Sequence, residues 1–154
     1  MEPLSVAVHA VNTLAQLRAN QSIAIFGCGP VGLLCMAVAK ALGARRIIAI
    51  DIVPARVDFA LSYAATEAFL PPPFEAGESR MQYSKRASML LKEKLGIDER
   101  GEKSLDVVVD ASGAEVCVQM ALLIAKIGGT FIQVRPVNNI GRNERPRLTL
   151  CALF

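Results

Sequence analysis

A glycine-rich turn between two short apolar runs is the feature of this chain that most restricts its fold. The first run, residues 22–26, leads into residues 27–32 (Gly-Cys-Gly-Pro-Val-Gly) and an apolar helical pattern. The second run, residues 47–50, ends at Asp51. A strand, a G-x-G-x-x-G turn, a helix and an acid about 20 residues further on form the pattern of a dinucleotide-binding βαβ unit. This context makes the glycine motif a specific signal.

Each residue type in the turn has a physical task. Gly27 permits the tight turn from strand to helix, Gly29 lets a diphosphate approach the backbone, and Gly32 lets the helix pack closely on the sheet. Pro30 suits the first helical turn, where a missing N–H costs little. From about Val31 the free N–H groups and the positive end of the helix dipole face the phosphates. We expect the turn to hold a diphosphate.

Asp51 predicts which dinucleotide is preferred. At the end of the second strand its carboxylate can accept hydrogen bonds from both adenosine ribose hydroxyls, each contributing about 1.5–3 kcal/mol. A 2′-phosphate at this place would lose these bonds and add like-charge repulsion. The sequence therefore favours NAD over NADP. Arg56 is the nearby residue that could soften the preference, and a solvated helix residue is the alternative interpretation of it.

Length and composition indicate one α/β domain. The chain has 154 residues, 53% of them hydrophobic and 20% charged, which suits a parallel sheet covered on both faces. No apolar stretch reaches the 18 or so residues that a membrane span needs, and the N-terminus lacks the basic start of a signal peptide. We expect no membrane partner and a cytoplasmic location.

The net charge of +3 does not indicate a nucleic-acid partner. The C-terminal stretch 135–154 by itself carries +3, from Arg135, Arg142, Arg145 and Arg147 against Glu144. The preceding residues therefore sum to zero. A neutral domain with few aromatic residues lacks the basic surface and the stacking side chains that nucleic acids require.

The cysteines and the single histidine do not form a recognisable metal site. Cys28, Cys35, Cys117 and Cys151 show no C-x-x-C spacing, and His9 has no second ligand near it in the sequence. We interpret the cysteines of the turn and its helix as small packing residues, and His9 as a structural residue.

The remaining pattern alternates strands with helices. We predict a helix over 3–17, then strands at 22–26, 47–50, 68–70, 105–109 and 130–134, with helices at 31–42, 54–63, 81–95 and 115–126. This alternation predicts a Rossmann-type α/β fold: a doubly wound parallel sheet in three layers, with strand order 3-2-1-4-5 and the sixth strand missing or replaced. Residues 1–20 would form a junction helix and residues 21–134 the NAD-binding domain.

Residues 135–154 have a loop composition followed by a short apolar end, residues 148–154. That end is either an edge strand or an unpaired apolar tail. We favour poor order, because the proline- and arginine-rich approach does little to fix the register of a following strand.

Several segments together resemble one family. Residues 2–10, 27–34, 51–56, 110–115 and 128–134 are similar to the cofactor domain of zinc-dependent medium-chain dehydrogenases, and within them to the polyol branch of sorbitol, xylitol and arabinitol dehydrogenases. Residues 69–73, with 77–80 and 83–84, resemble the fungal xylitol dehydrogenases, also called D-xylulose reductases. The resemblance covers residues 1–134.

The resemblance implies reversible oxidation of a polyol to a ketose, with hydride transfer to NAD and a zinc ion that polarises the reacting oxygen. By motif, the diphosphate would be held by Gly27, Gly29, Pro30, Val31 and Gly32. The adenosine would be surrounded by Asp51, Ile52 and Arg56, and the crevice lined by Ser112 and Gly113. Glu2 matches a glutamate that lies beside the zinc and the substrate in polyol dehydrogenases.

Two departures from the family lead to a further expectation. The lobe that supplies the cysteine, histidine and glutamate zinc ligands would precede Met1, and residues 135–137 (Arg-Pro-Val) stand where the family usually has glycine, an apolar residue and glycine. No catalytic set is complete in the chain. We therefore expect a truncated polyol dehydrogenase with little activity of its own.

Two other functions are compatible with parts of the sequence. The first is a non-catalytic NAD-binding module that associates with intact homologues through sheet edges. The second is an S-adenosylmethionine methyltransferase, which also combines a glycine-rich first turn with an acid after the second strand. Pro30 within the turn and Phe26 before it, where an acid would be expected, argue against the methyltransferase.

Overall fold

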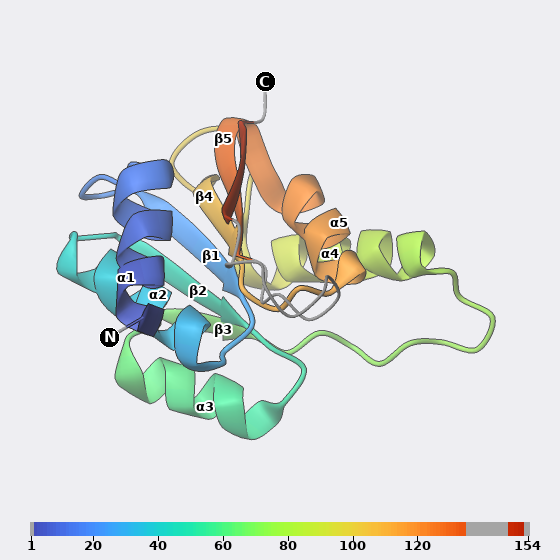
Figure 1. Cartoon of the computed structure of the whole chain (residues 1–154). Coiled ribbons are helices and arrows are strands. Elements are labelled where there is room, and N and C mark those ends of the chain that lie inside the picture. Colours follow the sequence, from blue (N-terminus) through green and yellow to red (C-terminus); the bar gives the residue numbers. More distant parts are fainter. Residues whose placement is uncertain (1, 135–147, 153–154) are drawn as a thin grey trace.

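The computed structural model describes residues 2–134 and 148–152, and its centre is a six-stranded sheet (Figure 1). The strands are β1 (Ser22–Phe26), β2 (Arg46–Ile50), β3 (Glu67–Phe69), β4 (Leu105–Asp110), β5 (Ala125–Val134) and β6 (Leu148–Ala152). Their order is β3-β2-β1-β4-β5-β6, and every pair is parallel except β5 with β6. The predicted Rossmann order 3-2-1-4-5 is confirmed.

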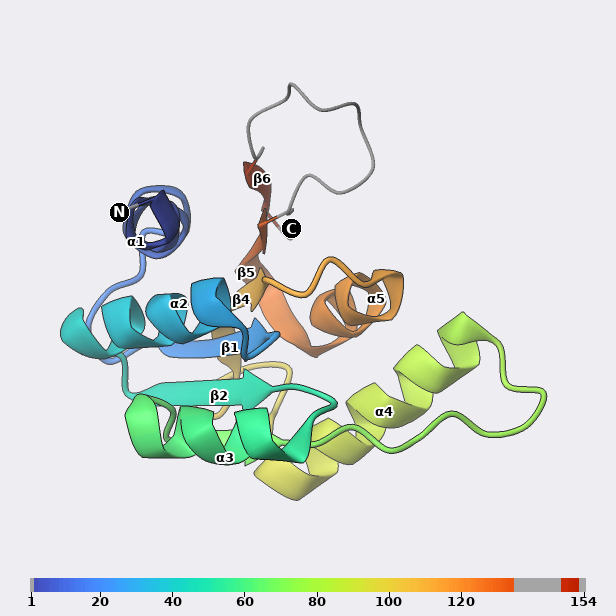
Figure 2. The same cartoon turned by 60° about the horizontal axis from the view of Figure 1, so that its bottom comes forward.

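Helices cover both faces of the sheet (Figures 1 and 2). They are α1 (Glu2–Val8), the π-helix η1 (His9–Leu14), α2 (Pro30–Ala41), α3 (Pro54–Tyr63), α4 (Arg80–Leu95) and α5 (Glu115–Ile124). In β1, Ile23 and Ile25 pack into one buried cluster with the first helices, while Ala24 and Phe26 pack into the other cluster with α4 and α5. Because both faces are buried, the central residues of these strands are mostly apolar, as expected of a doubly covered parallel sheet, and the charged residues lie towards the strand ends.

The N-terminal helix differs in detail from the expected helix over 3–17. After Val8 the backbone widens into the π-helix, where Ala15 N–H donates to the Ala10 carbonyl oxygen at 2.9 Å, five residues back. Gln16, with φ of 50°, then turns the chain out of the helix. Ala10 and Val11 are both fully buried, and the wider turn places these neighbours together against the core.

The start of β5 also differs from the expected turn and strand. Helix α5 ends at Ile124, and Ala125 already pairs with Leu105 of β4. The next pair is Val107 with Thr130, so the predicted glycine turn lies in an irregularity within β5. Gly128 has φ of +75°, a conformation that favours glycine and explains its place in the kink.

The apolar end of the chain forms an edge strand over part of its length. Leu148–Ala152 pairs antiparallel with β5, from Val134↔Leu148 to Thr130↔Ala152. This is the edge-strand alternative, and it differs from the poor order that we favoured for residues 148–152. The reason is that β5 presents an unpaired row of backbone groups on the side away from β4. Met1, residues 135–147 and residues 153–154 lie outside the described residues, and the expected domain limits stay predictions.

Candidate functional site

The glycine turn lies where the strands of the parallel sheet end. We call this side of the sheet, at the last residues of β1, β2 and β4, the carboxyl edge. Gly27 N–H donates to the Ile50 carbonyl oxygen at 2.8 Å, and Ala111 N–H donates to the Phe26 carbonyl oxygen at 2.8 Å. Backbone hydrogen bonds therefore connect the turn to strand β2 on one side and to the segment after β4 on the other. Ligands of open α/β sheets bind in a crevice at such a point.

Gly27 and Gly32 allow the turn, the start of helix α2 and the segment after β4 to approach one another more closely than a side chain at either position would permit. Gly27 has φ of +92°, and a Cβ there would lie 3.0 Å from the Ser112 backbone nitrogen. A Cβ on Gly32 would lie 1.8 Å from the Gly27 carbonyl oxygen, well inside any allowed contact. Helix α2 can therefore begin directly against the turn only because both positions lack a side chain.

The first turn of helix α2 presents backbone N–H groups at the turn. Gly29 is the residue before the helix and Pro30 its first residue. The first helical hydrogen bond runs from Leu33 N–H to the Gly29 carbonyl oxygen at 2.9 Å, so the N–H groups of Val31 and Gly32 precede the helical ladder. A Cβ on Gly29 would meet no atom within 4 Å, so the space at the residue before the helix is open. The arrangement suits an anion such as a diphosphate.

Asp51 joins the end of β2 to the glycine turn. Its Oδ2 accepts the Cys28 N–H at 2.8 Å, and its Oδ1 accepts the Val53 N–H at 2.9 Å. The side chain is only 6% exposed, whereas Arg56, whose Nη1 lies 3.8 Å from Oδ2, is 59% exposed. Each carboxylate oxygen still has a second lone pair for a further donor. Ile52, 74% exposed, follows directly and offers an apolar surface beside the carboxylate.

Asp110 occupies the corresponding place at the end of β4. It is fully buried, and its Oδ1 accepts hydrogen bonds from Ser112 N–H at 2.9 Å, Ser112 Oγ–H at 2.6 Å and Gly113 N–H at 3.3 Å. Within the part of the chain that the structure describes, its Oδ2 has no hydrogen-bond partner. We did not select Asp110 from the sequence. The sequence did contain a signal for it: Asp110 is an acid at the end of an apolar strand, and Asp51 stands at the corresponding place after β2.

Burial keeps the thiols of this region protonated. It raises the pKa of Cys28 to about 12, with a smaller contribution from the Asp51 carboxylate and a small opposing one from Arg56. Burial also raises the pKa of Cys35 to about 12. The pKa of Cys117 is raised mainly by burial, although its hydrogen bond with Ser112 lowers it. Cys28 and Cys35 are part of a buried apolar cluster, which agrees with their interpretation as packing residues.

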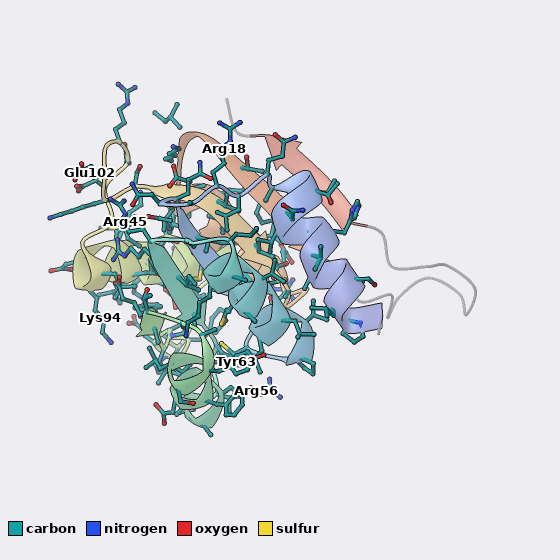
Figure 3. The ribbon with its side chains drawn as sticks, turned by 90° about the vertical axis from the view of Figure 1, so that its left-hand side faces the viewer. Arg18, Arg45, Arg56, Tyr63, Lys94 and Glu102 are labelled. Atoms are coloured by element: carbon teal, nitrogen blue, oxygen red, sulfur yellow. The ribbon has the colours of Figure 1, made fainter. Side chains whose placement is uncertain are left out.

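The structure brings most of the predicted site residues to the carboxyl edge. The turn residues, Asp51, Ser112 and Gly113 lie there, around the end of β1. Arg56 lies near Asp51 and is well separated in Figure 3 from Arg45 and Glu102, which lie together in another part of the molecule. Glu2 begins helix α1, but its side chain is outside the described part of the chain. Among the described residues there is no group of three or more His, Cys, Asp or Glu that could hold a metal ion. None of the described helices is both long enough and apolar enough to cross a membrane.

The sequence and fold match known proteins. A family model described as zinc-binding dehydrogenase matches residues 30–135. D-xylulose reductase A from Aspergillus niger is 44% identical over 144 residues, which cover 94% of this chain and 36% of that protein. D-xylulose reductase A from Aspergillus oryzae is 43% identical with the same coverage. The crystal structure of galactitol-1-phosphate dehydrogenase from Escherichia coli is 28% identical, with a TM-score of 0.60 over 83% of this chain and 32% of that one. The chain thus spans about a third of the length of the curated relatives it matches.

Proposed function

The chain belongs to the zinc-binding dehydrogenase family, and we propose that it is the NAD-binding part of a polyol dehydrogenase of the D-xylulose reductase type. The observation that carries the proposal is the arrangement at the carboxyl edge. A glycine turn, open at Gly29 before the start of α2, lies next to the carboxylate of Asp51, which follows the neighbouring strand. The glycine turn suits the phosphates of a dinucleotide, and the Asp51 carboxylate suits the two hydroxyl groups of its ribose.

The residues present fit a dinucleotide. The N–H groups of Val31 and Gly32 would hold the diphosphate, with Gly27, Gly29 and Pro30 shaping the backbone around it. Asp51 is kept in place by its bonds to Cys28 and Val53, so its remaining lone pairs are fixed in direction and ready for ribose hydroxyls. Ile52 and Arg56 would lie beside the adenosine, and Ser112 and Gly113 would line the crevice. When bound, NAD would supply the acceptor of a hydride from the substrate carbon.

The polyol substrate is inferred from the relatives. Two relatives named D-xylulose reductase A align with 94% of this chain, and a polyol is the reduced partner of such a ketose. Zinc, which the family name implies, does not fit the described residues, because they contain no cluster of metal-binding side chains. No step of a reaction is therefore assigned to zinc in this chain. The expectation of little activity from the chain alone stays a prediction.

Association with intact homologues is a second proposal. The outer edge of β6 lies at one end of the sheet, and the short strand β3 lies at the other. Either edge could pair with a further strand. Mixing the purified chain with an intact homologue, followed by size-exclusion chromatography, would show co-migration if this proposal is right. We also propose the cytosol as location, in keeping with the free thiols of Cys28, Cys35 and Cys117.

The proposed cofactor is tested by calorimetric titration of the full chain with NAD and NADP. We expect NAD to bind at least about tenfold more tightly, because a 2′-phosphate would lose hydrogen bonds to Asp51 and meet its negative charge. Asp51→Asn removes that charge and should reduce the preference to within about threefold. Because Asn has a single acceptor oxygen, the N–H of Cys28 or of Val53 also loses its acceptor, so both dinucleotides should bind more weakly than to the unsubstituted chain.

Asp58→Asn is the matched control, because Asp58 is an exposed acid on helix α3, which follows Asp51. It should leave the preference unchanged. An unaltered preference for NAD in Asp51→Asn would show that Asp51 does not recognise the ribose. Failure of the unsubstituted chain to bind either dinucleotide would contradict the proposed function.

A further inference from the structure

Two buried carboxylates lie on opposite sides of the glycine turn. In the register of the sheet, Phe26 of β1 is paired with Ile50 of β2 on one side and with Asp110 of β4 on the other. Asp51 is the residue after Ile50. The turn that follows Phe26 is therefore flanked by one acid at the end of each neighbouring strand. Asp51 contacts the turn directly, through Cys28 N–H.

Asp110 acts on the segment that follows its own strand. Its Oδ1 gathers three donors from Ser112 and Gly113, and Ser112 Oγ in turn accepts the Ala114 N–H at 3.1 Å. Ala114 is the residue before helix α5. This relay fixes residues 111–114, the loop between β4 and α5, in one conformation. Bonds to a buried charged acceptor are stronger than neutral ones, so the carboxylate dominates the conformation of this loop.

The same loop is packed against the glycine turn. A Cβ on Gly27 would lie 3.0 Å from the Ser112 nitrogen and 3.1 Å from the Ala111 carbonyl carbon. The Ala111 N–H donates to the Phe26 carbonyl oxygen at 2.8 Å. With so little space between them, a displacement of the loop changes its contact with Gly27.

We propose that Asp110 is a positioning residue for the cofactor crevice: through Oδ1 alone it holds residues 111–114 against the glycine turn from the β4 side, as Asp51 holds the turn from the β2 side. The inference rests on the proposed function only for the identity of the bound dinucleotide. Asp110 does not touch that ligand in this account. Asp110→Asn should be better tolerated than Asp110→Ala. It replaces the unpaired Oδ2 by an amide nitrogen and so removes no hydrogen bond that the structure contains.

The test compares Asp110→Ala, Asp110→Asn and Asp106→Ala in the full chain. Asp106 is the matched control because it lies on the same strand and also accepts a backbone N–H, from Ser22 to its Oδ2 at 2.8 Å, while its Oδ1 binds Lys126. Unlike Asp110, which ends β4, Asp106 lies near the beginning of that strand. Circular dichroism identifies a temperature at which every variant is folded. Hydrogen–deuterium exchange of the backbone amides and the dissociation constant for NAD are then measured at that temperature.

For Asp110→Ala we expect exchange at residues 112–114 and 27–28 to accelerate about tenfold or more, and NAD to bind about tenfold more weakly, as for the loss of one charged hydrogen bond. Asp110→Asn keeps the Oδ1 acceptor but not its charge, so both changes should be clearly smaller than in Asp110→Ala. Asp106→Ala should accelerate exchange around Ser22 and leave the affinity for NAD unchanged.

Unchanged exchange at residues 112–114 in Asp110→Ala would overturn the inference, and so would an equal loss of NAD affinity in Asp106→Ala. Changes in Asp110→Asn as large as those in Asp110→Ala would also overturn it. If Asp110→Ala does not fold, Ser112→Ala removes one of the three donors and should give the same changes in smaller measure. If the unsubstituted chain binds no NAD, the proposed function fails, while the exchange measurements still decide the role of Asp110.

Discussion

The two edges of the parallel sheet use their acids differently. At the edge where the strands begin, which we call the amino edge, carboxylates are paired with cations. Glu67 forms a two-pronged ion pair with Arg46, at 2.5 Å and 2.7 Å, and Asp106 binds Lys126. At the carboxyl edge, Asp51 and Asp110 accept hydrogen bonds chiefly from N–H groups of the main chain instead.

The difference shows how one sheet separates stability from binding. An acid neutralised by a lysine or arginine stabilises its surroundings but has little capacity left for a ligand. An acid held chiefly by backbone N–H groups fixes the shape of a loop without a cation bonded directly to it. Arg56 is the cation described near Asp51, and it is mostly exposed at a distance of 3.8 Å. The carboxyl edge is therefore the edge suited to hold a dinucleotide.

The largest expected effect comes from a methyl group at the carboxyl edge. Gly32→Ala would place Cβ 1.8 Å from the Gly27 carbonyl oxygen, so helix α2 must move away from the turn. We expect a loss of about 3 kcal/mol in the free energy of unfolding, the upper end for overpacking, together with loss of NAD binding. Urea denaturation and calorimetric titration measure the two effects.

Gly29→Ala is the matched control for that substitution. A Cβ at Gly29 meets no atom within 4 Å, and its φ of −78° suits any residue. We expect at most a small loss of stability, because alanine is a poorer residue than glycine before a helix, and weaker NAD binding, because the methyl group would occupy the open space where we propose that the diphosphate approaches the turn. Equal stability of Gly32→Ala and the unsubstituted chain would contradict the close approach described here.

A smaller effect on the free energy of unfolding is expected at alkaline pH, from the buried thiols of Cys28 in the glycine turn and Cys35 in helix α2. The pKa values of Cys28 and Cys35 are raised by burial from 9.0 to about 12. Because the folded pKa is the higher one, their contribution to stability is complete below pH 9 and is lost as the pH rises from about 9 to 12. At pH 10 each thiol should have lost about 1 kcal/mol.

Urea denaturation of the unsubstituted chain and of the Cys28→Ala, Cys35→Ala double variant, each at pH 8 and pH 10, measures this contribution. The variant should lose less stability between the two pH values than the unsubstituted chain. An identical loss in both proteins would mean that the thiols are accessible to water in the folded state.

The smallest effect is expected from the amino edge. Glu67→Gln removes the ion pair with Arg46, whose partners are 34% and 14% exposed, so it should cost about 1 kcal/mol or less. The cost should shrink with added salt, and the affinity for NAD should not change. A clear weakening of NAD binding in this variant, seen by calorimetry, would break the division between the two edges.

Much of the fold follows from local pattern. The apolar run at residues 22–26 and the helical spacing at 54–63 agree with β1 and α3, because apolar periodicity and proline at a helix start are local signals. The alternation of strands with helices indicated a doubly wound parallel sheet, and the glycine motif with Asp51 indicated the Rossmann order of its strands. The widening of the first helix into η1 had no such signal, because it depends on how Ala10 and Val11 pack against the rest of the core.

The candidate site was predicted only where a motif marks it. The glycine spacing and Asp51 are motif residues, whereas the role of Asp110 depends on the sheet register that brings β4 beside β1. The hydrogen bonds that the Cys28 and Val53 N–H groups donate to the Asp51 carboxylate could not be predicted from the sequence either, since they require the folded turn. Glu2 stays a prediction, because its side chain is not among the described ones.

The division between the two edges is tested most directly by mapping where NAD binds. Amide resonances of the ¹⁵N-labelled chain are followed by NMR during titration with NAD. The account predicts that the shifted amides cluster at residues 27–33, 51–53 and 112–114, while those of Ser22, Arg46 and Glu67 at the amino edge stay in place. Shifts centred on the amino edge, or no saturable shifts at the glycine turn, would contradict it.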